Sequence, residues 1–278
     1  MPDLIALTLT LEPLPAAVGA PAPRWWGRAV HAMWLDVVHQ LDAPLAQMLH
    51  DGSMLRPYTL SSLLGRFGEG RIMADETYRL RITTLQEEMS DLLARAVSAG
   101  PLAPGERVVL DYHGFRVVGV DWDEGPWTGQ ADYTALAANA LARGERPSRR
   151  IEMLFSSPTS FRSRKRFVPV PLPELVFGSL LKRWNAFAPV AFPEEAKRYA
   201  EECLAIARYE LRTRTVELKD RGKRPGAVGN ITYASFNYDR YWMGVMHALA
   251  AWAKFGGVGS GVTLGLGQCR QQNSRNER

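Results

Sequence analysis

Thirteen residues near the end of the chain, from Phe255 to Gly267, contain six glycines. Because glycine has no Cβ, such a backbone enters positive φ freely and leaves its amides uncovered, as close approach to a phosphate requires. An apolar run precedes the glycines and Val262–Leu264 follows them, so the predicted order is helix, glycine loop, strand. A dinucleotide fingerprint has the opposite order, and no Lys-Ser or Lys-Thr pair marks a nucleotide-triphosphate loop. The stretch predicts an anion-binding cradle, with an ordinary tight connection as the alternative.

The periodicity of apolar residues predicts one order of elements twice: strand, helix, strand, strand, helix, strand. The first set is expected at residues 4–11, 24–41, 58–67, 78–85, 86–98 and 107–120. After a linker helix at 132–142, the second set is expected at 150–155, 173–187, 206–218, 230–238, 240–254 and 262–270. This βαββαβ order is that of a ferredoxin-like, or RRM-like, domain. We therefore predict an α+β fold with two tandem ferredoxin-like domains, residues 1–125 and 126–278.

The bulk composition is that of a globular protein, with 46% hydrophobic and 23% charged residues in 278 and a net charge of +5. Only six of the 34 basic residues are lysines. Arginine suits bidentate phosphate contacts, although a genomic composition bias would also favour it. Cys203 and Cys269 stand far apart, which argues for a reducing compartment and against a zinc pair. With no signal-like start and no membrane-spanning run, we expect a soluble cytoplasmic protein.

Charge gathers between Arg143 and Arg166, where eight basic residues face two acidic ones. The densest part, Ser160–Phe167, mixes cations, hydroxyls and flanking aromatics, which are the ingredients for phosphate contact and base stacking. A solvated loop is the alternative. The candidate nucleic-acid contacts are Arg149, Arg150, Arg162, Arg164, Lys165 and Arg166, with Lys254, Gly257, Gly259, Ser260, Gly261 and Thr263 at the glycine stretch. A second basic tract, Arg208–Arg224, is diluted by acidic residues and predicts an exposed strand face and turn.

Among the five histidines, His50 differs because Asp51 and Gly52 follow it at a predicted helix end, so its ring can face solvent and a ligand. An imidazole titrates near neutrality and is the usual means of moving a proton to or from RNA oxygens. An ordinary surface histidine is the alternative. His31 and His39 lie within the first predicted helix, where packing or surface roles are the default.

One acidic group could suggest a metal: Asp121, Asp123 and Glu124. Gly125 and Pro126 follow at once, which marks a turn, and no histidine lies nearby in the sequence. We therefore expect neither a metal site nor a cofactor.

Four blocks of the sequence closely resemble the CRISPR-associated precursor-RNA endoribonucleases of the RAMP superfamily. They are Leu49-His50 with Arg56–Thr59, then Phe155–Phe161, then Phe177–Phe187, and finally Gly257–Gly267. The glycine block is the most specific for the superfamily, and the histidine block for the nuclease family within it. The resemblance spans nearly the whole chain, in order.

This resemblance implies two ferredoxin-like domains, a role in prokaryotic antiviral defence, and metal-independent cleavage within the repeats of the CRISPR transcript. In that reaction the ribose 2′-hydroxyl attacks the adjacent phosphorus, which leaves a 2′,3′-cyclic phosphate and a 5′-hydroxyl. His50 falls on the family's histidine and is the implied general acid or base. Arg56 stands where relatives often carry lysine; it can stabilise the phosphorane but does not readily donate a proton. His31 and His39 are candidates for the second proton-transfer group, in place of a tyrosine that some relatives carry.

Two alternatives remain open at this stage. The chain could be a non-catalytic RAMP subunit that only binds guide RNA in an effector complex, or a metal-dependent nuclease that uses Asp121, Asp123 and Glu124. The expected partner is CRISPR repeat RNA, with other CRISPR effector subunits as further candidates. A monomer and a homodimer are both compatible with the sequence.

Overall fold

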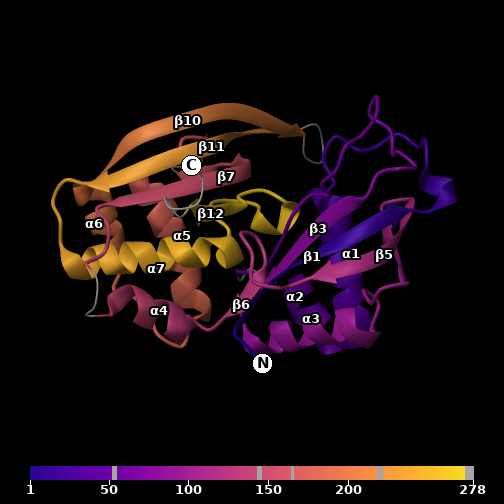
Figure 1. Cartoon of the computed structure of the whole chain (residues 1–278), viewed down its shortest axis with the longest axis horizontal. Coiled ribbons are helices and arrows are strands. Elements are labelled where there is room, and N and C mark those ends of the chain that lie inside the picture. The colour runs from indigo at the N-terminus through magenta and orange to yellow at the C-terminus, as the bar shows by residue number, and fades with distance from the viewer. Residues whose placement is uncertain (52–54, 143–145, 164–165, 218–221, 273–278) are drawn as a thin grey trace. The chain divides into compact units, whose positions relative to one another are not determined.

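The computed structural model describes residues 1–51, 55–142, 146–163, 166–217 and 222–272 (Figure 1). Its contacts divide the chain into two compact units. The first comprises Met1–Gln130 and Thr263–Gly265, and the second comprises Ala131–Val262 and Leu266–Arg278. Within the described ranges, no helix has both the length and the apolar character needed to cross a membrane.

The first unit is a ferredoxin-like fold with additional short elements. Its elements are β1 (Leu4–Pro13), the 3-10 turn η1 (Pro15–Ala17), α1 (Gly27–Leu41), α2 (Ala43–Asp51), β2 (Tyr58–Leu60), β3 (Tyr78–Thr84), α3 (Glu87–Ala99), β4 (Arg107–Leu110), β5 (His113–Asp121) and β6 (Gly129–Ala131). The sheet order is β2-β3-β1-β5-β4, and β6 also pairs with β1. β1 runs antiparallel to both β3 and β5, as the βαββαβ order requires.

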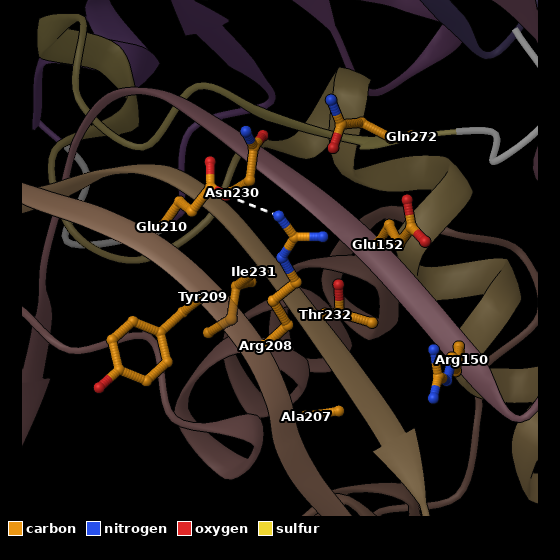
Figure 2. Close-up of a pocket in the computed structure, with 10 residues that line it drawn as sticks. All are labelled: Arg150, Glu152, Ala207, Arg208, Tyr209, Glu210, Asn230, Ile231, Thr232 and Gln272. Atoms are coloured by element: carbon orange, nitrogen blue, oxygen red, sulfur yellow. Dashed lines mark hydrogen bonds and ion pairs between the residues drawn. The ribbon is translucent and has the colours of Figure 1, made fainter. Parts of the chain in front are cut away.

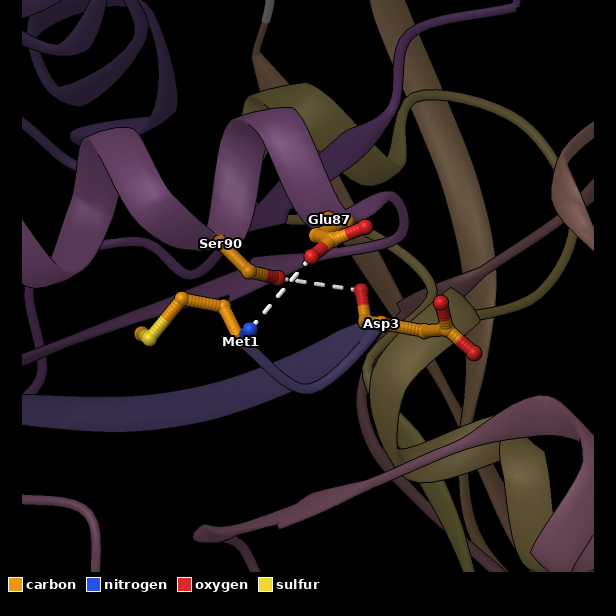
Figure 3. A network of polar contacts seen from close by, with 4 residues as sticks. All are labelled: Met1, Asp3, Glu87 and Ser90. Atoms are coloured by element: carbon orange, nitrogen blue, oxygen red, sulfur yellow. Dashed lines mark hydrogen bonds and ion pairs between the residues drawn. The ribbon is translucent and has the colours of Figure 1, made fainter.

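β1 is the centre of this unit, and its first four residues, Leu4 to Leu7, are fully buried. From Thr8 to Glu12, partly buried or exposed polar residues alternate with the buried Leu9 and Leu11, as expected for a strand with one covered face. The start of the chain is fixed to α3: Ser90 Oγ donates to the Asp3 carbonyl at 2.9 Å, and the Met1 amino group lies 3.4 Å from Glu87 Oε1 (Figure 3).

The second unit repeats the order of elements. Its elements are α4 (Tyr133–Leu141), β7 (Arg150–Thr159), β8 (Phe161–Ser163), β9 (Arg166–Val168), α5 (Pro173–Phe187), α6 (Glu195–Cys203), β10 (Leu204–Glu217), β11 (Lys223–Ser235), α7 (Arg240–Gly256), the 3-10 turn η3 (Val262–Leu264) and β12 (Cys269–Gln272). The four-stranded sheet has the order β10-β11-β7-β12, and β8 and β9 form a separate hairpin.

The two faces of this second sheet differ in character. Ile151, Met153 and Phe155 are buried, and Figure 1 shows α5 and α7 on one side of the sheet. Arg150 and Glu152 alternate with them and lie on the opposite face, because successive side chains of a strand point to opposite sides. The sequence 150–156 therefore alternates as expected for a sheet with one covered face, whereas 157–159 are all buried.

Two predicted elements are corrected by the structure, and one helix was not predicted. The strand expected at 58–67 ends at Leu60: the Arg81 amide donates to the Ser61 side chain, and pairing with β3 resumes only as an isolated bridge between Leu64 and Arg79. The strand expected at 262–270 is a 3-10 turn at Val262–Leu264, and pairing begins only at Cys269. α6 has no counterpart among the predicted elements.

Candidate functional site

His31 in α1 contacts Tyr58 in β2: the Nε2 atom lies 3.1 Å from the phenolic oxygen. Tyr58 is fully buried, and its pairing with Thr84 of β3 fixes its backbone. Trp34, one helical turn after His31, meets the same ring edge-on with centroids 5.8 Å apart. A sheet residue thus orients a histidine that is itself only partly buried.

The electrostatics of this contact hold both partners in their neutral forms. Burial raises the pKa of Tyr58 to about 12, although the positive charge of Arg56 acts in the opposite direction. Burial is also the main cause that lowers the pKa of His31, and Arg56 lowers it further. At neutral pH the phenol is protonated and the imidazole is uncharged. We refer to His31, Arg56 and Tyr58 as the His31 cluster.

The other two candidate histidines lie in the last turns of their helices. His50 is exposed in the last turn of α2, directly after the buried Leu49. His39 is exposed in α1, eight residues after His31 and therefore about 12 Å further along the helix axis. The structure thus brings Arg56 to His31 and leaves His39 apart from that cluster.

The glycine-rich stretch adopts the backbone conformation predicted for it. Five glycines have positive φ, between 60° and 84°: Gly257, Gly259, Gly261, Gly265 and Gly267. This region of φ favours glycine because a Cβ would clash with the following carbonyl.

Three amides of the stretch, however, donate hydrogen bonds to other residues of the chain. Gly259 N donates to Ser179 Oγ at 2.8 Å, Ser260 N to the Ser160 carbonyl at 2.9 Å, and Gly267 N to the Pro158 carbonyl at 3.2 Å. The expectation that these amides face a phosphate is therefore wrong. The glycines are needed for close packing: a Cβ on Gly259 would lie 2.6 Å from the Ser160 carbonyl oxygen.

One part of the glycine-rich stretch, Thr263–Gly265, belongs to the first unit. The Leu264 carbonyl accepts a hydrogen bond from Trp25 Nε1 at 2.7 Å, and Gly265 forms a bridge with Ser61. A Cβ on Gly27, the first residue of α1, would overlap the Leu264 carbonyl. His31 follows Gly27 by four residues, about 6 Å along the helix. The segment therefore packs roughly one helical turn before the His31 cluster.

The basic stretch of the sequence is divided between the two ends of β7. Arg149 and Arg150 lie at its start, whereas Arg162 and Arg166 lie beyond its end in the β8–β9 hairpin. Ten strand residues span about 33 Å, so these pairs cannot contact the same phosphate. Arg164 and Lys165 lie outside the described residues.

The arginines at the start of β7 lie beside an aromatic ring and a polar pocket. The Arg149 guanidinium lies 4.8 Å from the centroid of the Tyr238 ring, and that of Arg146 lies 4.1 Å from it. Arg150 lines a polar pocket of about 390 Å³ on the open sheet face (Figure 2). There, Arg208 bonds to Glu210 at 2.7 Å, so part of its charge is neutralised.

The remaining predicted residues have less distinctive positions. Lys254 lies in the last turn of α7, 5.1 Å from the Phe255 ring, where a cation favours the helix dipole. Thr263 is partly buried in η3. In the acidic group, Asp121 Oδ1 accepts from the Asp123 amide, and no group of three potential metal ligands occurs in the part of the chain that the structure describes.

Sequence reasoning missed the role of Tyr58, although it named the Arg56–Thr59 block. The only local signal is an aromatic residue two positions after the candidate cation. Its contact with His31 depends on how α1 packs on the sheet, and a sequence pattern does not report that.

Both units have the ferredoxin-like order of elements, and the glycine-rich stretch precedes the last strand. A RAMP protein described as binding different RNA substrates shares this fold, with a TM-score of 0.56 at 15% identity over 97% of this chain and 100% of its own. The family model for the CRISPR-associated endoribonuclease Cas6 matches residues 153–269, which lie in the second unit except for three residues.

Solved Cas6 structures match over both units. A Cas6 product complex is 29% identical, with a TM-score of 0.77 over 97% of this chain and 99% of its own. A second product complex, of a Cas6 from Thermus thermophilus, is 25% identical, with a TM-score of 0.80 over 98% and 100%. No curated protein sequence matches. The predicted resemblance is confirmed: residues 153–269 match the Cas6 endoribonuclease family model, and solved Cas6 structures are similar to the chain over both units.

The packing role of the glycine-rich stretch predicts the effect of Gly259→Ala. Alanine at a φ of 75° costs about 1–2 kcal/mol, and the contact with the Ser160 carbonyl adds to it. We expect a thermal midpoint several degrees below wild type. The control is Gly19→Ala, because Gly19 has the same φ region, at 76°, with open space around it. Equal losses in the two variants would show that close packing contributes nothing at Gly259.

The lowered pKa of His31 predicts how stability depends on pH. Between the folded pKa and about 6.5, the unfolded chain binds more protons, so stability rises with pH across that window. We expect the thermal midpoint to fall between pH 7.5 and 5.5, and to fall less in His31→Gln. The exposed His39→Gln is the control and should keep the wild-type dependence. A His31→Gln variant with that same dependence would contradict the assignment.

Proposed function

We propose that this chain cleaves CRISPR precursor RNA within its repeats by attack of the ribose 2′-hydroxyl on the adjacent phosphorus, without a metal ion. The products are a 2′,3′-cyclic phosphate and a 5′-hydroxyl. The observation that carries this proposal is the His31 cluster, in which a neutral imidazole, a buried phenol and an arginine lie together in the first unit. The likeness to Cas6 product complexes supports RNA as the substrate.

The reaction needs a proton to be moved and the charge of the phosphorane to be stabilised. We assign the proton transfer to His50, which is exposed and can reach a bound strand. We assign the stabilisation to Arg56, whose guanidinium stays protonated in every step. Arg56 follows His50 by six positions in the sequence, so one short segment supplies both groups.

The second group is His31 rather than His39. The protonated Tyr58 phenol can donate to His31 Nε2, which places the ring proton on Nδ1. In this tautomer Nδ1 donates, while Nε2 is occupied and does not accept a proton from the 2′-hydroxyl. His31 therefore serves as an oriented hydrogen-bond donor to the ribose or phosphate, and the role of general acid or base is left to His50.

The cellular setting follows from this chemistry and is part of the proposal. The partner is repeat RNA, the site of action is the cytoplasm, and the role is antiviral defence. Association with other CRISPR effector subunits, and the choice between a monomer and a homodimer, stay predictions from the sequence.

Four proteins test the catalytic assignment: wild type, His50→Ala, His31→Ala and His39→Ala, each incubated with labelled repeat RNA in excess EDTA. Loss of a general acid or base typically costs about 10²- to 10⁴-fold in rate with little ground-state affinity. We expect that loss in His50→Ala, a smaller loss in His31→Ala and wild-type cleavage in His39→Ala. Repeat affinity should be nearly unchanged in all three variants.

The same assay separates the alternatives. Binding without cleavage by the wild type would favour a guide-RNA-binding subunit. Cleavage that stops in EDTA and returns with Mg²⁺ or Mn²⁺ would favour a metal-dependent nuclease. Cleavage by His50→Ala within a few-fold of wild type would remove His50 from the mechanism.

A further inference from the structure

Arg224, near the start of β11, lies against two neighbours that the sequence places far away. Its guanidinium carbon is 4.3 Å from the centroid of the Phe167 ring in the β8–β9 hairpin. Its Nη1 atom would be 3.0 Å from a Cβ on Gly261 of the glycine-rich stretch. The absence of a side chain at Gly261 thus leaves space that the guanidinium fills.

The charge of Arg224 is not balanced by an acidic side chain in the described ranges of the chain. Its Nε atom is buried without a hydrogen-bond partner there. Burial lowers the pKa of Arg224, and the positive charge of Arg162 lowers it further. A buried donor without a partner and a second positive charge acting on the same group are both unfavourable, and an anion bound by Arg224 and Arg162 lowers both costs.

A second unsatisfied group lies at the same stretch. Ser160 is 1% exposed, and its Oγ atom has no hydrogen-bond partner among the described residues. Its carbonyl accepts from the Ser260 amide and lies against Gly259, so Ser160 packs on the residues directly before Gly261. Buried polar atoms are generally satisfied in folded proteins, so unsatisfied ones indicate a bound partner or a strained site.

We propose that Arg224, together with Arg162, binds a phosphate group beside Gly261, and that in the proposed function this group belongs to the RNA backbone. A guanidinium offers a planar fork that matches phosphate oxygens, and the Phe167 ring holds its plane. The anion site thus consists of side chains at the glycine-rich stretch, while the amides of Gly259, Ser260 and Gly267 serve the fold. The RNA part rests on the proposed function; the phosphate site does not.

The first test compares Arg224→Gln with Arg214→Gln, which removes the same charge from an exposed position on β10. Repeat RNA affinity is measured over a series of salt concentrations. We expect Arg224→Gln to bind about tenfold more weakly, with the slope of log affinity against log salt reduced by roughly 0.7, the value for one single-strand phosphate contact. Arg214→Gln should stay within about twofold of wild type. Equal effects in the two variants would overturn the proposal.

The second test uses inorganic phosphate and no RNA. Thermal midpoints are measured with and without phosphate at constant ionic strength, with chloride as the replacement. Phosphate should raise the midpoint of wild type and of Arg214→Gln, but not that of Arg224→Gln. Without phosphate, Arg224→Gln should be about as stable as wild type, whereas a purely structural arginine would lower the midpoint. Equal stabilisation of all three proteins would contradict the site.

Arg224→Lys keeps the positive charge but lacks the planar guanidinium, so it tests the site even if Arg224→Gln fails to fold. It should show an RNA affinity between those of wild type and Arg224→Gln. Affinity equal to wild type would show that the fork is not used. If the wild type cleaves repeat RNA but Arg224→Gln and Arg214→Gln behave alike in the phosphate and salt experiments, the anion site is wrong and the proposed function stands. If phosphate stabilises the protein through Arg224 but the wild type does not bind repeat RNA, the proposed function is wrong and the anion site stands.

Discussion

The backbone of the glycine-rich stretch packs so closely on its neighbours that side chains are excluded at several positions. In the second unit, Gly259 lies against the Ser160 carbonyl at the start of the β8–β9 hairpin, and the Ser260 amide bonds to it. In the first unit, Leu264 receives the Trp25 indole hydrogen bond near the start of α1. Within each unit, the part of the stretch that belongs to it is thus held by specific backbone and side-chain contacts.

This arrangement gives the amides a structural role and leaves charge recognition to side chains. The positive charge of Arg56 lowers the pKa of His31. The positive charge of Arg162 lowers the pKa of Arg224. In the first case the cation helps to keep an imidazole neutral. In the second, the positive charge of Arg162 acts on Arg224, whose Nε atom has no hydrogen-bond partner among the described residues, and this favours a bound anion.

The sequence predicted the features that depend only on neighbouring residues along the chain. The alternation around Tyr78–Thr84, the amphipathic run of α1 and the positive φ at Gly257 all follow from side-chain period or the absence of a Cβ. Features that depend on contacts between distant segments could not be predicted from the sequence. Val262–Leu264 has strand propensity, yet the backbone between positive-φ glycines closes into a 3-10 turn. The acceptors of the glycine amides, the Tyr58–His31 contact and the position of Arg224 beside Gly261 are likewise set by segments distant in sequence.

The central claim is that a ribose 2′-hydroxyl is the nucleophile. Once the scissile bond has been mapped, a repeat RNA with a single 2′-deoxynucleotide on its 5′ side keeps every phosphate but lacks that nucleophile. The account predicts that wild-type protein binds this RNA with unchanged affinity and does not cleave it, while the all-ribose RNA yields a 2′,3′-cyclic phosphate end. Cleavage of the deoxy-substituted RNA at the rate of the all-ribose RNA would contradict the account, because water would then be the nucleophile.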